Sequence, residues 1–337
     1  MIVKHYIFTM NKKILKFVST FIILIFAIIT NVIFGAQKLN LSDIFSNYEN
    51  FSQIIFVKLR LPRMILCCVS GIFLASSGSI LQLFFRNSLI ESSVLSITSG
   101  STLGAVLSIY FGNIILFNGL ISSISIFAFI GSLMSGLLIC LLSKLTNNSS
   151  IKLILCGSVL SSFYSAITSI LLYANNEKLN AIYCWMLGSF SGRGWKEIQF
   201  IIIPSIIALT LIIICSNKLD LVSGGENVAE SLGVNVMLLK TLIIITVSIS
   251  TSISVCCGGT IGFIGLIAPH ISGKLFGSKS KTLIIMSMII GSILVLFADT
   301  LSRTIIAPTE LPIGTITALM GSPFFISILL NKNGVKQ

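Results

Sequence analysis

The side chains most able to do chemistry in this chain are the few charged residues that border its long apolar runs. Asp299 lies four residues before Arg303, so in a helix the two side chains share a face, and we predict that they pair. Arg60 and Arg63 are three residues apart and also share a face if Pro62 opens a helix at its first turn. A proton relay inside a membrane usually needs a chain of ionisable groups, and the sequence offers none. We therefore expect Asp299 to be structural, orienting Arg303 or capping a neighbouring helix.

The other reactive side chains give weaker signals. His270 follows Pro269 in a glycine-rich run, and we expect a packed, hydrogen-bonded group rather than a ligand. Glu310 precedes Pro312 and could contact another helix, but no role is assigned to it. The eight cysteines include two adjacent pairs inside apolar runs and no CxxC or Cys/His spacing. We predict small packing residues, no metal site, no cofactor and no catalytic residue.

Composition fixes the broad class. The chain has 337 residues, of which 55% are apolar and 9% charged, and its net charge is +12; its mean hydropathy is +1.03. Soluble domains carry about 25% charged residues, so this chain lacks the polar surface that a water-exposed protein needs. Composition therefore excludes an ordinary soluble enzyme and a disordered chain. It indicates an all-α polytopic membrane protein.

Apolar runs predict about ten transmembrane helices in one bundle that forms a single domain over residues 1–337. The spans are expected near 17–36, 64–85, 94–111, 119–142, 151–173, 198–215, 239–257, 260–277, 283–306 and 312–330. The first run could be a secretory signal, but its length and the spans that follow favour a retained helix. With an even count both termini share a side, and a cytoplasmic placement puts most basic residues inside.

One connection, residues 217–236 between the sixth and seventh spans, stands apart from the others. Gly224 and Gly225 can end the incoming helix, Glu226 suits a helix N-terminus, and Gly233 suits a helix stop. Between them Val228, Ala229 and Leu232 recur at helical spacing. We predict a short helix with one apolar face, which is either an ordinary structured loop or a docking element for a partner.

A series of motifs resembles the permeases that import iron-siderophore complexes, haem and vitamin B12, called FecCD-type. The series begins with RLPR and RNSL and continues through SGSTLG, WMLGSFSG and GGENVAESLG to GTIGFIGLIAPH, ADTLSR, ELPIG and GSPFF. These motifs occupy residues 60 to 325 in the order and spacing typical of the family. Two features depart from it: Ser88 stands where Pro is usual, and residues 1–57 match only as a first span and outer loop.

The resemblance implies a type II ABC importer permease fold and a dimer of identical or sister subunits. It implies that Arg60, Arg63 and Arg303 dock an extracytoplasmic binding protein, although headgroup anchoring would also explain arginines at a membrane surface. It implies that the 217–236 segment docks a cytoplasmic ABC ATPase through Gly224, Gly225, Glu226, Ala229, Leu232 and Gly233. Asn87 and Leu89 would close the pathway at the cytoplasmic face, although an Asn turn at a helix end is the simpler interpretation.

The function expected is import of an iron-siderophore complex through the cell membrane, with haem or vitamin B12 as the alternative substrate. No GxxxxGK[ST] phosphate loop is present, so ATP would be hydrolysed on another polypeptide. A secondary transporter is a more distant alternative, although its broken helices would carry polar groups at the midplane, whereas here the charges gather at the ends of the runs. A membrane-embedded enzyme would need paired acidic residues, and none is present.

Overall fold

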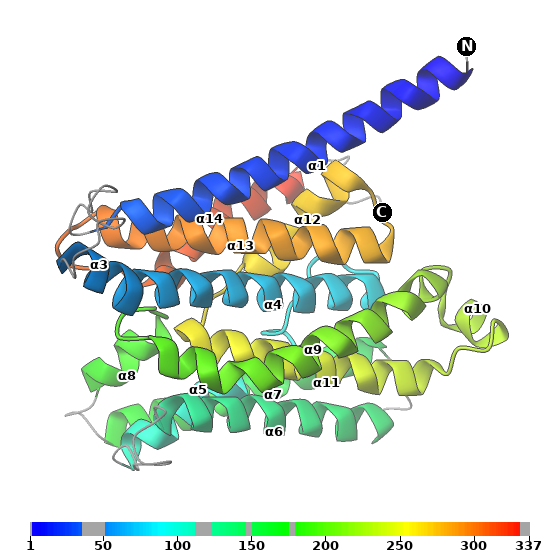
Figure 1. Cartoon of the computed structure of the whole chain (residues 1–337). Coiled ribbons are helices and arrows are strands. Elements are labelled where there is room, and N and C mark those ends of the chain that lie inside the picture. The colour runs from blue at the N-terminus through cyan, green and yellow to red at the C-terminus, as the bar shows by residue number, and fades with distance from the viewer. Residues whose placement is uncertain (1, 36–50, 112–122, 146–149, 175–178, 331–337) are drawn as a thin grey trace.

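The computed structural model describes residues 2–35, 51–111, 123–145, 150–174 and 179–330, and in these ranges the regular structure is helical. The helices lie roughly side by side in one bundle (Figure 1). Their bounds are α1 Ile2–Ile33, α3 Phe51–Ile55, η1 Phe56–Arg60, α4 Leu61–Phe85, α5 Ile97–Tyr110, α6 Ser123–Leu145, α7 Ser150–Ala174, α8 Leu179–Met186, α9 Trp195–Val222, α10 Glu226–Ser231, α11 Val236–Gly258, α12 Ile264–Phe276, α13 Ser280–Thr304 and α14 Ile313–Leu330.

A helix lies at each of the ten predicted spans. Seven described helices are long and apolar enough to cross a membrane. The remaining three predicted spans are the shorter helices α5, α12 and α14. At 1.5 Å per residue, the 13 residues of α12 reach only about 20 Å, less than the ~30 Å hydrocarbon core. Helix α12 therefore begins inside the bundle. It follows a non-helical segment, residues 259–263, which separates it from α11.

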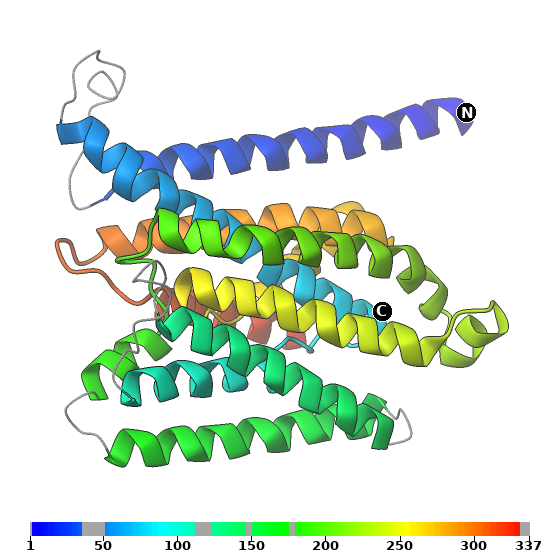
Figure 2. The same ribbon diagram turned by 60° about the horizontal axis from the view of Figure 1, so that its bottom comes forward.

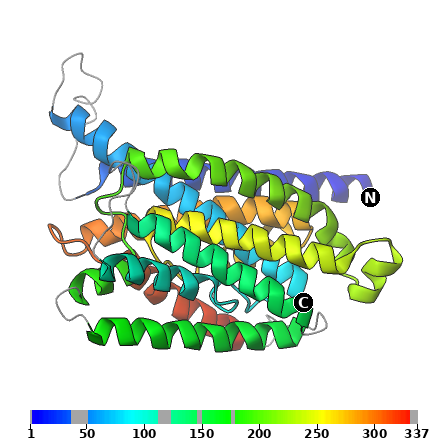
Figure 3. The ribbon, with the colours of Figure 1, turned by 90° about the horizontal axis from the view of Figure 1, so that it is seen from below.

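The two ends of the bundle carry different elements. Helix α10 projects at one end, where α1 begins and toward which α14 runs, whereas α3 and α8 lie at the opposite end (Figures 1 and 2). We call these the α10 end and the α3 end. The start of α1 and the end of α14 therefore both lie at the α10 end. Figure 3, seen from below, gives the same separation of α10 from α3 and α8.

Pro62 lies in the first turn of α4, as predicted, but the helical segments α3 and η1 that lead directly into α4 were not predicted. The chain is helical without interruption from Phe51 to Phe85, and its segment Phe56–Arg60 is a π-helix. The Leu61 N–H donates to the carbonyl of Phe56, five residues back. Proline lacks an N–H, and its ring clashes with the carbonyl four residues back in a regular helix. The wider π turn lets the helix pass through Pro62 rather than begin there.

A second boundary also differs from the sequence prediction. The connection expected from residue 217 begins later, because α9 continues to Val222. Leu219 and Val222 are buried and extend the apolar face of α9. The connection between α9 and α11 therefore covers residues 223–235 and contains α10.

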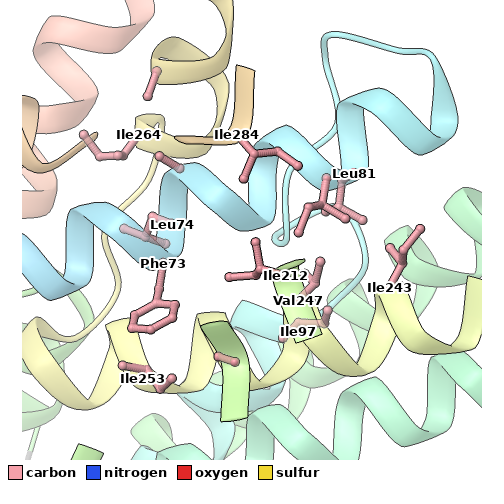
Figure 4. Packing of buried hydrophobic residues seen from close by; sticks show 14 of the residues in the cluster. Phe73, Leu74, Leu81, Ile97, Ile212, Ile243, Val247, Ile253, Ile264 and Ile284 are labelled. Carbon is pink, nitrogen blue, oxygen red and sulfur yellow. The ribbon is translucent and has the colours of Figure 1, made fainter. Parts of the chain in front are cut away.

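Helix α4 forms the centre of the bundle and packs along α11, α12 and α13. Phe73, Leu74 and Leu81 of α4 lie among isoleucines and a valine from the surrounding helices (Figure 4). Small residues let the backbones of neighbouring helices approach closely. A Cβ on Gly78 would stand 1.9 Å from the carbonyl oxygen of Gly265, and one on Gly71 2.5 Å from that of Gly291.

Gly78→Ala should therefore lower the stability of the bundle. The added methyl group meets backbone of α12, which cannot rotate away, and such overpacking typically costs about 1–3 kcal/mol. The free energy of unfolding in detergent micelles measures the effect. Gly273→Ala in α12 is the control, because its Cβ would meet only Leu283 Cδ1 at 3.7 Å. Equal stability of the two variants would contradict close α4–α12 packing.

Candidate functional site

A cluster of charged side chains lies at the α3 end, where α1, α4 and α13 meet. Its centre is Asp299, whose side chain is fully buried. The Arg63 guanidinium donates to Asp299 Oδ1 from Nε at 3.0 Å and from Nη2 at 2.8 Å. Arg303 Nη2 lies 3.0 Å from Asp299 Oδ2, so the predicted pair one helical turn apart is confirmed. One carboxylate thus bridges two arginines from different helices.

Glu310 joins this cluster from the segment before α14. Arg63 Nη1 and Nη2 donate to its two carboxylate oxygens at 2.8 and 3.0 Å, a bidentate pair. The inter-helix contact considered for Glu310 is therefore present. Its side chain is 30% exposed, so this pair lies at the rim of the cluster. Arg63 connects the buried acid to the exposed one.

The end of α1 completes the cluster through backbone carbonyls. Arg60 Nη1 donates to the carbonyls of Val32 and, at 2.7 Å, Ile33. Arg303 Nη2 donates to the carbonyl of Asn31 at 2.8 Å. The last carbonyls of a helix lack intrahelical partners and carry partial negative charge, which favours arginine there. Arg60 and Arg303 therefore cap α1.

Asn31 is a member of the cluster that the sequence reasoning missed. Its Nδ2 donates to Asp299 Oδ2 at 3.0 Å and to the carbonyl of Leu296 at 3.2 Å. The available signal was one buried amide near the end of an otherwise apolar run. Nothing in the sequence pairs that amide with a helix 265 residues away.

Burial defines what this cluster can offer to a partner. Arg60 is 7% and Arg303 6% exposed, and the Arg63 side chain is 12% exposed. Protein oxygens accept hydrogen bonds from each of the three guanidinium groups. Three arginines face two carboxylates, which leaves the cluster with one net positive charge at the α3 end.

At the α10 end the structure contains the predicted short helix, Glu226–Ser231. Gly225 precedes it at φ +120° and Gly233 follows it at φ +81°, conformations that favour glycine. Ala229 is fully buried, so it fixes α10 to the bundle and does not form an outer surface. Leu232 is 60% exposed and projects from the same end.

The predicted gate residues occupy a turn directly after α4. Arg86 has a left-handed backbone with φ +48°, which ends the helix. Asn87 Oδ1 accepts the backbone N–H of Leu89 at 2.9 Å, and the Leu89 side chain is exposed. Ser88, the departure from the family pattern, lies within this turn. The turn is therefore held by an Asn side chain rather than by proline.

Beyond this turn the chain lines a cavity of about 470 Å³ that the sequence did not predict. Its walls come from α4, from residues 91–98 at the entry to α5 and from residues 186–187 at the end of α8. The non-helical residues 260–263 and the first turns of α12 and α14 complete the lining. Glu91 is the charged residue among its described lining residues. The other polar side chains there are hydroxyls, including Thr98, Thr260 and Thr315.

The expectation for His270 is met only in part. Its ring packs edge-on against Phe324 with centroids 6.1 Å apart. Its Nε2 is buried, however, and finds no hydrogen-bond partner within the described ranges. Over the same ranges no group of three His, Cys, Asp or Glu side chains could hold a metal ion.

The membrane-length apolar helices show a multi-pass membrane protein. The family match described next makes it a permease, a transport protein rather than an enzyme. The sequence profile of the FecCD transport family matches residues 23–331, and the chain belongs to this family. Its fold is that of type II ABC importer permeases.

Relatives and a solved structure agree with this assignment. The chain is 34% identical over 300 residues to an iron chelatin transport system permease protein of Helicobacter pylori, covering 88% of this chain and 89% of that protein. It is 36% identical over 275 residues to the molybdate import system permease MolB of Haemophilus influenzae, covering 81% and 80%. A solved inward-facing metal-chelate type ABC transporter superposes with a TM-score of 0.82 at 30% identity, covering 92% of this chain and 97% of that one.

Asp299→Asn should destabilise the protein strongly, because it leaves two buried arginines without their shared negative charge. Removing one partner of a buried ion pair typically costs about 3–5 kcal/mol. Glu310→Gln is the matched control, since a more exposed pair contributes only about 0.2–1 kcal/mol. Unfolding in detergent micelles compares the two variants. Similar losses in both would show that Asp299 is not the centre of the cluster.

Proposed function

We propose that this chain is the membrane subunit of an ATP-driven importer for iron-siderophore complexes, acting as one permease domain over residues 1–337. The observation that carries the proposal is the contrast between the two ends of the bundle. One end presents a short helix with exposed apolar side chains, and the other presents a polar cluster with net positive charge. The family assignment and the metal-chelate transporter of similar fold support it.

The α10 end would face the cytoplasm, with both chain termini on that side, and would bind a pair of ABC ATPase subunits. Val228 and Leu232 are 47% and 60% exposed on or next to α10, and an exposed apolar surface is stabilised when a partner covers it. Gly224, Gly225 and Gly233 would set the shape of this element, Ala229 would anchor it, and Glu226 would begin it. ATP would be hydrolysed on the partner, a separate polypeptide.

The α3 end would face outward and receive the binding protein that delivers the substrate. Arg60, Arg63 and Arg303 would attract acidic groups on its lobes through the net positive charge of the cluster. Arginine suits this role because its planar fork pairs bidentately with carboxylates. Since the arginines are largely buried, they would act at a distance, through the positive electrostatic potential of the cluster. Arg63 and Glu310 at the rim could also rearrange to contact the partner directly.

Transport would follow alternating access in a dimer of permease subunits, identical or sister chains. Asn87 and Leu89 would close the pathway on the cytoplasmic side while the outer side receives substrate. Closure and opening of the ATPase pair would move α10 and so bias the two states of the permease.

Alternative substrates and mechanisms make distinct predictions. Haem or a corrinoid such as vitamin B12 would use the same architecture, and the molybdate permease among the relatives shows that substrates vary within this group. Iron-siderophore is favoured because the Helicobacter pylori relative is described as an iron chelatin permease. A secondary transporter would need coordinating groups at midplane, for which Glu91 in the cavity is the candidate in the described ranges.

Reconstitution with the ATPase and binding protein tests the substrate. We expect ATP hydrolysis in vesicles to rise most when the binding protein carries a ferric siderophore, and less with haem or cobalamin. If haem or cobalamin gave the strongest stimulation of ATP hydrolysis, that compound would be the substrate instead. Transport without ATP would indicate a secondary transporter.

Leu232→Asp tests docking at α10 in the same vesicles. A buried charge in the apolar contact should abolish the stimulation while leaving the fold intact, because Leu232 is exposed in the free chain. Glu230→Gln on the same helix is the control and should retain stimulation. Normal stimulation of Leu232→Asp would remove α10 from the ATPase interface.

Glu310→Gln tests docking at the α3 end and leaves the pairs that Asp299 makes with Arg63 and Arg303 in place. Loss of this rim carboxylate raises the positive charge of the cluster, so the binding protein should bind more tightly by about 0.2–1 kcal/mol, the range of an exposed pair. Affinity in nanodiscs at low and high salt measures the change, which should shrink as salt screens the charges. Glu230→Gln at the opposite end is the control. Unchanged or weaker binding of Glu310→Gln would contradict a docking role for the arginines.

A further inference from the structure

A second cavity, of about 190 Å³, lies at the α3 end, in the connection between α8 and α9. The backbone N–H of Ser189 in this connection donates to the carbonyl of Gly258 at the end of α11, at 2.8 Å. At the start of α9, Trp195 Nε1 donates to the carbonyl of Val57 at 3.0 Å. These contacts hold the connection against α11 and η1. We call the cavity the Arg193 pocket, and it is lined by Cys184, Trp185, Ser189, Ser191, Arg193 and Gly259.

The polar side chains of the Arg193 pocket are hydrogen-bond donors. The Arg193 guanidinium can only donate, and so can the indole N–H of Trp185. Ser189 Oγ already accepts the backbone N–H of Ser191 at 3.0 Å, so its own O–H remains able to donate. No acidic side chain is among the described residues that line the pocket. A pocket with several donors and one cation is suited to an anionic acceptor.

The guanidinium of Arg193 is oriented by a neutral group, and within the described ranges it forms no ion pair with a carboxylate. Arg193 Nη1 donates to the hydroxyl of Ser125 in α6 at 2.8 Å. Glu197, four residues further on, is buried, and its Oε2 instead accepts the backbone N–H of Gly194 at 2.8 Å. A guanidinium presents its donors in a planar fork that binds a carboxylate through two parallel hydrogen bonds. The charge of Arg193 is therefore held in place and remains available to an anion.

Trp185 adds an unsatisfied donor to the same pocket. Its Nε1 is buried and finds no acceptor in the described part of the chain. Buried N–H groups in folded proteins are almost always paired, so an unpaired one on a residue that lines a cavity indicates an acceptor bound there. Trp185 and Arg193 therefore call for the same kind of occupant.

The Arg193 pocket adjoins the larger cavity of about 470 Å³. Trp185 and Gly259 line the pocket, and the next residue of each segment, Met186 and Thr260, lines the cavity. Thr260 Oγ1 donates to the carbonyl of Met186, so these two segments form the wall between the two spaces. A group bound at Arg193 would thus lie beside the large interior cavity of the bundle.

We propose that the Arg193 pocket is a subsite for a carboxylate group of the transported chelate, with Arg193 as its anchor and Trp185 and Ser189 as further donors. This rests on the importer function proposed above and narrows its substrate class to ferric chelates that carry free carboxylates. Whole drug-sized ligands occupy about 300–1,000 Å³, so a pocket of about 190 Å³ fits one group of a bulky chelate. An acidic side chain of the binding protein has the same chemistry, and the experiment distinguishes the two sources.

Cys184 provides a native reporter, because it lines the pocket and its side chain is exposed. In nanodiscs of neutral lipid, its thiol is modified with an anionic or a cationic methanethiosulfonate reagent. We expect the ratio of the anionic to the cationic rate, normalised to free cysteine, to exceed one and to fall several-fold in Arg193→Gln. Arg193→Lys keeps the charge and should keep the ratio. Lys196→Gln, the same loss of charge outside the pocket lining, is the matched control, and Cys184→Ser gives the background of the other thiols.

Protection of Cys184 from modification identifies the ligand. Ferric citrate carries free carboxylates, whereas ferrioxamine B is a hydroxamate chelate with a cationic amine, and each is added without a binding protein. We expect ferric citrate to slow the modification of Cys184 and ferrioxamine B to leave it unchanged. Arg193→Gln should weaken protection by ferric citrate by about tenfold or more, as expected for a lost charge-assisted hydrogen bond. Arg193→Lys should retain most of the protection.

Three results would overturn the subsite. A rate ratio that is the same in Arg193→Gln and in the wild type would show that the pocket does not attract anions through Arg193. Equal protection by the two chelates, or none by ferric citrate, would remove the carboxylate preference. Protection by chelate-free binding protein but not by ferric citrate would assign the pocket to an acidic side chain of that protein. Neither measurement uses ATP or transport, so a failed subsite would leave the importer function to be decided by the vesicle assay alone.

Discussion

Backbone groups inside a bilayer have no water to bond, and this constraint governs the rest of the structure. Continuous helices satisfy it by themselves. Where helices stop inside the protein, side chains must supply the missing partners. Arg60 does so for the last carbonyls of α1, and Gln82 does so for the carbonyl of Gly265, which Pro269 leaves without a helical partner. Arg60 and Gln82 therefore stand where a helix ends or where a proline leaves a backbone carbonyl open.

The same constraint explains why charged groups cluster around Asp299. A buried carboxylate is tolerated only when it is paired and hydrogen-bonded. Arg63, Arg303 and Asn31 bring three elements to it, so a single acid fixes how α1, α4 and α13 meet at the α3 end. The arginines that the family resemblance assigns to docking are thus also the groups that hold this end together. A binding protein that drew on their charge would act on helix positions as well.

Periodicity and composition were enough to predict the spans, the short helix α10 and the Asp299–Arg303 pair, because each depends on residues close in sequence. The contacts of Asn31 and Gln82 could not be predicted, since their partners lie 183 to 268 residues away and polar side chains in apolar runs have many possible partners. Pro62 does lie in the first turn of α4, but the helical turns before it were missed for a local reason. Proline favours a helix start, and only the wider π turn before it shows how a longer helix absorbs it.

Helix α12 is well placed to link the two functional regions at the α10 side. Gly265 in its first turn accepts a hydrogen bond from Gln82, near the end of α4 and so just before the gate turn, and the segment that follows α12 is tied to α9. There Asp220 accepts hydrogen bonds from the backbone N–H and hydroxyl of Ser280 at 2.9 and 2.6 Å. Asp220 lies just before the connection that carries α10. Hydrogen bonds are directional, whereas apolar contacts can slide. A movement of α10 would therefore be transmitted to the gate turn through α12 rather than through the surrounding aliphatic packing.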